Sequence, residues 1–492
     1  MGVLHSLSAN WRQAMRRLVV VFVLALAALT PAAADPVFVT TPWIADLDQV
    51  RSAFLTKYAN LEWAVFDREV DLAQLFADTR ERVEGASNDA DARAAFDRLA
   101  RRLGDDHVEF RWPRSNEASQ AHRPVRDRCA ALGYDSRMRA RPLASHALGY
   151  QAITTQVEEF PIGLISSGAK AVGVIQIGVF TQQGFPTLCE AALKELAIPA
   201  NAPCDDACND RVDAWAVNRL TRDFIVQLQA LKAAGATALV ADIAGNGGGS
   251  EWAEAVARML TRTRVHSETI GFVRGEHWAQ TFADDEAKVR QFARQASGKD
   301  RALLLSLADQ LAARRKEALI PCDSAPLWQG RLAQCHWLGN GFYGSGLLPS
   351  ANPAELRGKS WAPLVFTPME FPYEEGVWSG PLVVLIDRDV ASAASEFAAI
   401  LQDNRAAIIV GEPSSGGCGH TNGGTPTRLT HSGGTLELPD CARFRADGSN
   451  EMRGIIPDVL VGFGVSDGPR LRAARFLSAL PGALDEASRL AH

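Results

Sequence analysis

Apolar residues recur every three or four positions between residues 43 and 106, for example at Leu47, Val50 and Phe54. This period is typical of amphipathic helices. The last of these helices should end near Gly104, because glycine favours the position just after a helix. We therefore expect a helical N-terminal domain over residues 35–112.

The pattern changes further along the chain. Val172–Phe180 alternates as a strand does and Ala238–Ile243 is an apolar run, while Asn218–Ala233 and Glu251–Leu260 have the period of helices. This order predicts an α/β fold with a largely parallel sheet that is covered by helices. We assign residues 166–465 to this core.

Two stretches interrupt the regular pattern. Residues 113–165 are expected to form an irregular connection, since the part up to residue 150 is rich in Arg, Pro and Ser. Residues 262–380 separate two strand–helix units, and a stretch of that length predicts an insertion or a lid. A C-terminal helix is expected within residues 466–492. Short strands are expected at Thr425–Thr430, Thr435–Pro439 and Asp458–Val461.

One strand–helix turn carries a candidate nucleophile. Leu382–Ile386 is an apolar strand that runs into a turn, after which small residues flank Ser392 and a helix follows. A serine at such a turn exposes its hydroxyl near the positive end of the helix, which suits a nucleophile. The alternative is a helix N-cap without chemistry, since serine is favoured there in any helix.

Residues 1–34 have the pattern of a signal peptide. Three arginines precede an apolar run from Leu18 to Leu29, and Ala32–Ala34 offers a cleavage site before Asp35. The run is short for a membrane span, although an uncleaved anchor is the alternative. We therefore expect a protein that is exported, periplasmic or secreted, with no membrane span after cleavage.

The net charge and the cysteine content indicate which partners and which cysteine chemistry to expect. Removal of residues 1–34 leaves 48 basic and 57 acidic side chains, and this net charge of −9 disfavours a nucleic-acid partner. All eight cysteines follow residue 34, and an even number in an exported chain predicts disulfides. A zinc site is disfavoured because no two CxxC pairs occur. The connectivity stays open; plausible local pairs are Cys204–Cys208, Cys322–Cys335 and Cys418–Cys441.

A glycine-rich turn over residues 245–249 ends one strand and opens a helix. Free backbone N–H groups at such a turn bind negative charge. The spacing fits neither the dinucleotide motif nor the phosphate loop. The turn could instead form an oxyanion hole, in which each donor is worth roughly 3 kcal/mol of barrier, or it could be a plain flexible turn.

Two further residues could assist a serine nucleophile. Serine needs a base at neutral pH, and His107 is the best-placed histidine because it follows a helix at a polar turn. Glu451 could orient a histidine or a hydroxyl, as the carboxylate of a catalytic triad does. Each residue also has an ordinary interpretation, as a structural histidine and as a solvated turn carboxylate.

Together these motifs resemble the S41 family of serine peptidases, the C-terminal-processing and tricorn-core-like group. The matching segments are Asp105–His107, Val240–Gly249, Leu382–Asp403, Val410–Glu412 and Glu451–Asp458. The resemblance implies a crotonase-like core behind a helical N-terminal domain. It also implies that no metal or organic cofactor is required.

The resemblance assigns roles to individual residues. The tail-processing branch of the family uses a lysine in the turn after Val-Gly-Glu, and Gly417 stands at that position here. The tricorn-like branch pairs a serine with a histidine and a supporting glutamate, a pattern that Ser392, His107 and Glu451 match. The amides of Ala393 and Gly248 would then form the oxyanion hole.

The sequence departs from the family pattern at three places, one of which is the unusual length of the stretch over residues 262–380. The arginine that commonly precedes Gly-Asn is Ala244 here, and the stretch after His107 is short for the PDZ module that many members carry. His420, close to the Gly417 turn, is a rival for the role of general base.

We therefore expect an exported serine peptidase that hydrolyses peptide or protein substrates through an acyl-enzyme on Ser392. One alternative is a catalytically silent relative that binds a hydrophobic ligand or peptide. An esterase acting at the same site is the other. The substrate sequence and the oligomeric state stay open.

Overall fold

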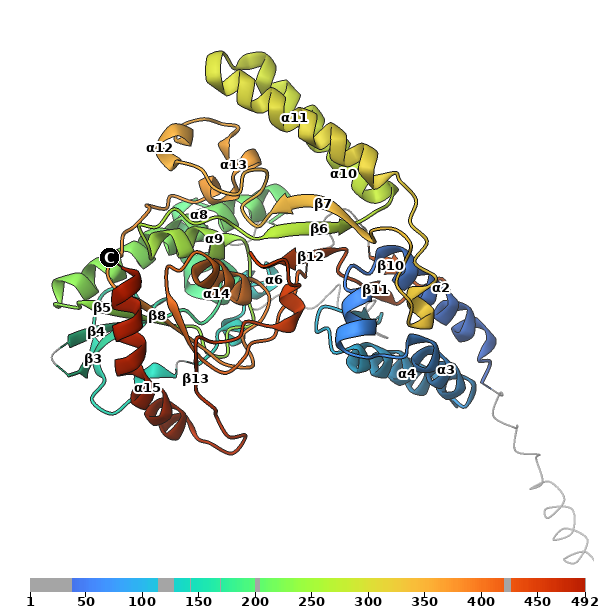
Figure 1. Ribbon diagram of the computed structural model, residues 1–492, viewed down its shortest axis with the longest axis horizontal. Coiled ribbons are helices and arrows are strands. Elements are labelled where there is room, and N and C mark those ends of the chain that lie inside the picture. Colours follow the sequence, from blue (N-terminus) through green and yellow to red (C-terminus); the bar gives the residue numbers. More distant parts are fainter. Residues whose placement is uncertain are drawn as a thin grey trace, which may run out of the picture.

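The computed structural model describes residues 38–113, 128–141, 143–168, 170–199, 204–419 and 426–491. The expected signal peptide, residues 1–34, and the rival base His420 lie outside these residues. Figure 1 shows a group of N-terminal helices beside a larger body built around a sheet, with a long helical hairpin projecting from that body.

A seven-stranded sheet lies at the centre of the larger body, in the order β13-β9-β8-β5-β4-β3-β2. Its parallel part consists of β4 (Lys170–Gln176), β5 (Ala238–Asp242), β8 (Leu382–Ile386), β9 (Ile408–Gly411) and β13 (Val459–Leu460). At one edge β3 (Ile162–Ser167) and β2 (Gln151–Ile153) continue the sheet in antiparallel fashion. The mixed α/β class predicted from the sequence is confirmed.

Both faces of the sheet are buried, which explains the continuous apolar runs of its strands. On one face, Leu239 and Val384 join a core with α8 (Asp206–Ala233), α9 (Trp252–Met259) and α14 (Ala393–Asp403). On the other face, Val240 and Val383 join a core with α15 (Pro469–Leu490). Neighbouring residues of one strand therefore belong to two different cores.

The N-terminal helices have an apolar cluster of their own, to which Trp43, Phe54 and Phe96 belong. Asn88 caps the last helix by accepting a hydrogen bond from the Asp91 N–H. These helices are α2 (Thr41–Lys57), α3 (Leu72–Glu84) and α4 (Asp89–Leu103). Beside them lies a small sheet of β1 (Glu109–Arg111), β11 (Thr435–Glu437) and β10 (Thr427–Arg428).

The stretch over residues 262–380 contains the hairpin of α10 (Glu276–Gln295) and α11 (Gly298–Ala318), which stands out from the body in Figure 1. Its strands β6 (Thr269–Val273) and β7 (Leu338–Tyr343) form a second small sheet with β12 (Cys441–Phe444). Two short helices follow, α12 (Pro353–Leu356) and α13 (Ala362–Val365). The insertion is thus a folded unit joined to the body by strand pairing.

Three boundaries differ from those expected. The strand expected over Val172–Phe180 ends at Gln176, because Phe180 pairs with the glycine run instead, donating its N–H to Gly248 O at 2.8 Å. Helix α8 begins twelve residues before Asn218, where the Asp205 side chain caps it. The connection over residues 113–165 includes the short helix α6 (Arg128–Ala131) and strand β2. Across the described residues, no helix is long and apolar enough to cross a membrane.

Candidate active site

Ser392 lies in the turn between β8 and α14. Its backbone has φ 52° and ψ −129°, and a positive φ of this kind costs of order 1–3 kcal/mol for a residue other than glycine. The side chain makes no capping hydrogen bond to the helix, which argues against the simple N-cap interpretation. The fold thus holds the Ser392 hydroxyl at the positive end of α14.

The glycine run lies directly beside this serine. A Cβ atom added at Gly248 would lie 2.7 Å from Ser392 Cβ and 3.0 Å from the Ala393 nitrogen. Gly248 also has a φ of 111°, which favours glycine. Its N–H donates to Asn246 Oδ1 at 2.9 Å, so the side chain of Asn246 orients this peptide. The two amides expected to form an oxyanion hole are therefore next to the candidate nucleophile.

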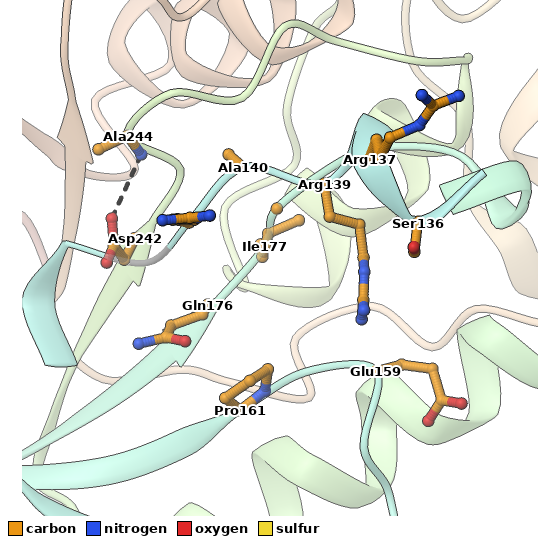
Figure 2. A pocket seen from close by; sticks show the side chains of 12 residues that line it. Ser136, Arg137, Arg139, Ala140, Glu159, Pro161, Gln176, Ile177, Asp242 and Ala244 are labelled. Carbon is orange, nitrogen blue, oxygen red and sulfur yellow. Dashed lines mark hydrogen bonds between the residues drawn. The ribbon is translucent and has the colours of Figure 1, made fainter. Parts of the chain in front are cut away.

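Asp242 fixes the point where β5 passes into the glycine run. Figure 2 shows its carboxylate beside a cavity of about 530 Å³ at the ends of β4 and β5. The carboxylate accepts the N–H groups of Leu143, Ala144 and Ala244 at 2.7, 2.6 and 3.2 Å. Burial nevertheless raises the pKa of Asp242 to about 6. These bonds hold the start of the loop that carries Gly248.

His107 follows α4, which ends at Gly104 in the left-handed conformation. Its Nδ1 atom lies 3.4 Å from Oδ1 of Asp105. Asp105 is 3% exposed, and its Oδ2 accepts hydrogen bonds from Tyr58 Oη at 3.0 Å and Asn60 Nδ2 at 3.2 Å. Burial and the Asp105 carboxylate together raise the pKa of Tyr58 well above its ordinary value. A buried, firmly held carboxylate therefore faces the imidazole.

The turn over residues 414–419 brings the serine and histidine segments together. Ser395, one helical turn after Ser392, donates to Ser415 O at 2.5 Å. At the other end of the turn, a Cβ at Gly417 would lie 3.3 Å from His107 Nδ1, and one at Gly419 would lie 2.3 Å from His107 Cδ2. The imidazole thus packs against the bare backbone of Gly417 and Gly419.

Glu451 lies in a buried cluster of charges. Its Oε2 atom is 2.7 Å from Arg443 Nε. Arg443 also pairs with Glu396 and donates to Gly417 O at 2.6 Å. Burial and the neighbouring Glu451 charge raise the pKa of Glu268 well above its ordinary value. Asp105 Oδ1 accepts the His107 backbone N–H at 3.0 Å and lies 3.4 Å from Nδ1 without a hydrogen bond to it, while Glu451 is paired with Arg443.

Four disulfides join all eight cysteines. Three are the local pairs that the sequence suggested, and the fourth, Cys129–Cys189, joins α6 to α7 (Pro186–Glu195). Cys418–Cys441 ties the turn beneath His107 to β12. Among the described residues, no group of three or more His, Cys, Asp or Glu side chains could hold a metal ion.

The chain is similar to known proteins in sequence and in fold. The sequence model of peptidase family S41 matches residues 211–461, just over half of the chain. The solved structure of mature CPAF aligns with a TM-score of 0.58 at 14% identity, covering 92% of this chain and 98% of that one. Mature CPAF complexed with lactacystin aligns with a TM-score of 0.57 at 15% identity, covering 92% and 99%. No curated protein matches the chain.

The structural likeness at such low identity establishes a shared fold, and the family match is the stronger finding. The chain belongs to peptidase family S41, a family of serine peptidases.

Proposed function

We propose that the protein hydrolyses peptide bonds, with Ser392 as nucleophile and His107 as general base. The Ser392 oxygen would attack the peptide carbonyl carbon while its proton passes to His107. His107 would then protonate the leaving amine as the C–N bond breaks, which leaves an acyl-enzyme. Water, activated by the same imidazole, would cleave the ester and restore the serine.

The observation that carries this proposal is the conformation of Ser392. A positive φ at a serine, at the start of a buried helix and against Gly248, is a strained arrangement that the fold maintains. The Ala393 N–H would donate to the developing oxyanion. The Gly248 N–H would join it by exchanging its hydrogen bond to Asn246 Oδ1 for one to the substrate. The packing of His107 against Gly417 and Gly419 supports a histidine base in place of a lysine.

We propose different roles for the two carboxylates near the site. Asp105 would orient His107 and stabilise its protonated form, since it lies 3.4 Å from Nδ1. Glu451 would act through Arg443, whose guanidinium donates to Gly417 O and so supports the turn beneath the imidazole.

The location of the protein and the class of its core are also proposals. Four disulfides fit an oxidising compartment, which supports export directed by residues 1–34. The parallel strands β4, β5, β8, β9 and β13 with intervening helices support a crotonase-like core. Peptides or proteins would be the substrates, as the family suggests.

A serine-directed fluorophosphonate probe tests the mechanism. The folded wild-type protein should be labelled, and Ser392→Ala should abolish labelling and peptide hydrolysis. Ser478→Ala, at an exposed serine of α15, is the matched control and should behave like wild type. Lactacystin, a ligand of CPAF, can serve as a competitor. Absence of labelling and hydrolysis in a folded protein would overturn the proposal in favour of a silent binding protein.

A further inference from the structure

A cavity of about 270 Å³ adjoins the helix of the candidate nucleophile. Glu396 of α14 lines it, and the Glu396 N–H donates to Ser392 O at 3.0 Å. Cys418, which follows the Gly417 that packs against His107, lines it as well. The cavity therefore begins within one helical turn of Ser392 and one residue of the turn beneath His107.

The opposite walls come from the insertion and are largely apolar. Phe342, Leu347 and Leu364 face the cavity, together with Ile270 of β6. Ligand pockets for drug-sized molecules usually hold about 300–1,000 Å³, so this cavity has the size for a single long side chain. Apolar walls of this kind accommodate the methylene groups of such a side chain.

The polar groups of the cavity are predominantly acidic. Glu251, Asp285 and Glu396 line it, and Arg443 is the one basic residue among the lining residues that the structure describes. Arg443 is already engaged, since it pairs with Glu396 and Glu451 and donates to Gly417 O. Asp285 pairs with Lys288 at 3.1 Å, and the Lys288 side chain is 58% exposed. The lining residues thus contribute three carboxylates and one guanidinium, an excess of acidic groups.

Gly344, in the wall, lies beside Glu396 and beside a further carboxylate, Glu254, which is not among the lining residues. A Cβ at Gly344 would lie 2.2 Å from Glu396 Oε1 and 2.4 Å from Glu254 Oε1. Glu254 is fully buried, and its Oε1 has no hydrogen-bond partner among the described residues. A buried carboxylate oxygen without a partner is costly unless a donor reaches it. The other oxygen of Glu254 pairs with Arg258, and Glu396 pairs with Arg443. Among the described residues, Glu254 Oε1 is therefore a buried oxygen that a further donor could still reach.

The raised pKa of Glu396 agrees with this excess of negative charge around the cavity. Burial raises its pKa to about 8, and the charges of Glu254, Glu451 and Glu251 add to that rise although Arg443 opposes it. The cluster thus holds a proton where an incoming cation could replace it.

We propose that this cavity is the specificity pocket of the enzyme and receives the side chain of lysine or arginine on the amino side of the scissile bond. The apolar walls would hold the methylene groups, and Glu251, Asp285 and Glu396 would bind the ammonium or guanidinium group. This inference rests on the proposed function, because it assigns a substrate to the same serine.

Fluorogenic peptides that differ only at that residue test the proposal on the full mature chain. Peptides with Lys or Arg should be cleaved with kcat/KM at least tenfold above those with Leu or Gln, and peptides with Glu should be the poorest. Mass spectrometry of the products fixes the bond that is cut. Equal or faster cleavage after Leu, or no enrichment of basic residues at the cut, would overturn the assignment.

Variants of the cavity provide a second readout that is independent of absolute activity. Asp285→Asn and Glu251→Gln should each lower the ratio of kcat/KM for the Lys peptide over the Leu peptide by threefold or more. The neighbouring Asp284→Asn on α10, at an exposed position outside the lining residues, should leave the ratio unchanged. Folded variants that keep the wild-type ratio would contradict the proposal.

The experiments distinguish failure of the specificity assignment from failure of the proposed peptidase function. If the fluorophosphonate labels Ser392 and peptides are cut without preference for Lys or Arg, the specificity assignment alone is contradicted. If neither labelling nor hydrolysis occurs in folded protein, the proposed function falls and the specificity assignment falls with it.

Discussion

Gly248 is in direct contact with Ser392: a methyl group at residue 248 would lie 2.7 Å from the serine Cβ. The two residues come from different strand–helix turns, one after β5 and one after β8. Because β5 and β8 are parallel neighbours, their carboxyl ends bring both turns to the same edge of the sheet. The order of strands in the sheet, with β5 next to β8, therefore brings Gly248 and Ser392 together at the candidate active site.

Gly248→Ala should reduce kcat by at least about 100-fold, because a shift of about 1 Å in a reacting group can cost this much. The new methyl group would push against both Ser392 and the Ala393 nitrogen, and φ 111° would be strained. Gly247→Ala is the matched control, since a Cβ there meets no atom within 4 Å. Steady-state hydrolysis of one peptide measures both. Similar losses in the two variants would contradict the contact.

Asp105→Asn should lower kcat by about 10²–10⁴-fold with little change in KM, because an amide cannot stabilise the imidazolium as a carboxylate does. Asp106→Asn, at the exposed neighbouring position, should stay near wild type. The pH profile of kcat should change only in the first variant. If Asp105→Asn is fully active, the orienting carboxylate is a different one and Glu451→Gln becomes the decisive variant.

Removal of the His107 imidazole distinguishes the two candidate bases. His107→Ala should lose hydrolysis about as completely as Ser392→Ala, since residues of a catalytic unit act together. His420→Ala should retain most activity. The reverse result, measured with the same peptide, would transfer the role of base to His420.

Arg443→Gln should lower the free energy of unfolding by about 3–5 kcal/mol, because it leaves buried carboxylates without their partner. Arg453→Gln is a suitable control: Arg453 pairs with Asp67 at the surface, where its side chain is 58% exposed, and such pairs contribute about 1 kcal/mol or less. Denaturant unfolding measures both variants. A loss below about 1 kcal/mol for Arg443→Gln would show that the cluster tolerates its absence.

The stability of the protein should fall as pH rises from about 5 to 8. Burial raises the pKa of Glu396 to about 8 from an ordinary value of 4.5, so the folded protein holds a proton that the unfolded chain releases over this range. The contribution is fully present below pH 4.5 and is lost as pH rises through 8. Glu396→Gln cannot ionise, and its melting temperature should fall less steeply with pH. Parallel curves for wild type and variant would contradict the assignment.

Much of the fold could be predicted because buried strands leave a strong pattern. Leu382–Ile386 is fully apolar and bounded by turn residues, and it forms β8 at those same residues. The helical N-terminal segment was equally visible, since Phe96 and Leu99 follow the helical period and are buried. Helices and strands of this kind can be predicted from the local residue pattern alone, without knowing which distant segments they contact.

Contacts between distant segments could not be predicted in the same way. The pairing of β6 with β12 joins residues near 270 to residues near 443, and neither segment specifies its partner. The Cys129–Cys189 bridge and the pairing of Arg443 with Glu396 depend on the same tertiary arrangement. Asp105 was visible in the Asp-Asp-His motif, yet its contact with the imidazole depends on how Tyr58 and Asn60 hold it.

The hairpin of α10 and α11, with helices of 20 and 21 residues, enters the chain after the glycine run and before the nucleophile. Only Thr281 and Asp285 of these two helices reach the cavity beside α14. The segments that carry Gly248 and Ser392 are therefore separate in sequence from the part of the cavity wall that α10 supplies and that would select the substrate side chain. Mutations along one face of a single helix could redirect such an enzyme to new targets in the course of evolution, while its hydrolytic apparatus is inherited intact.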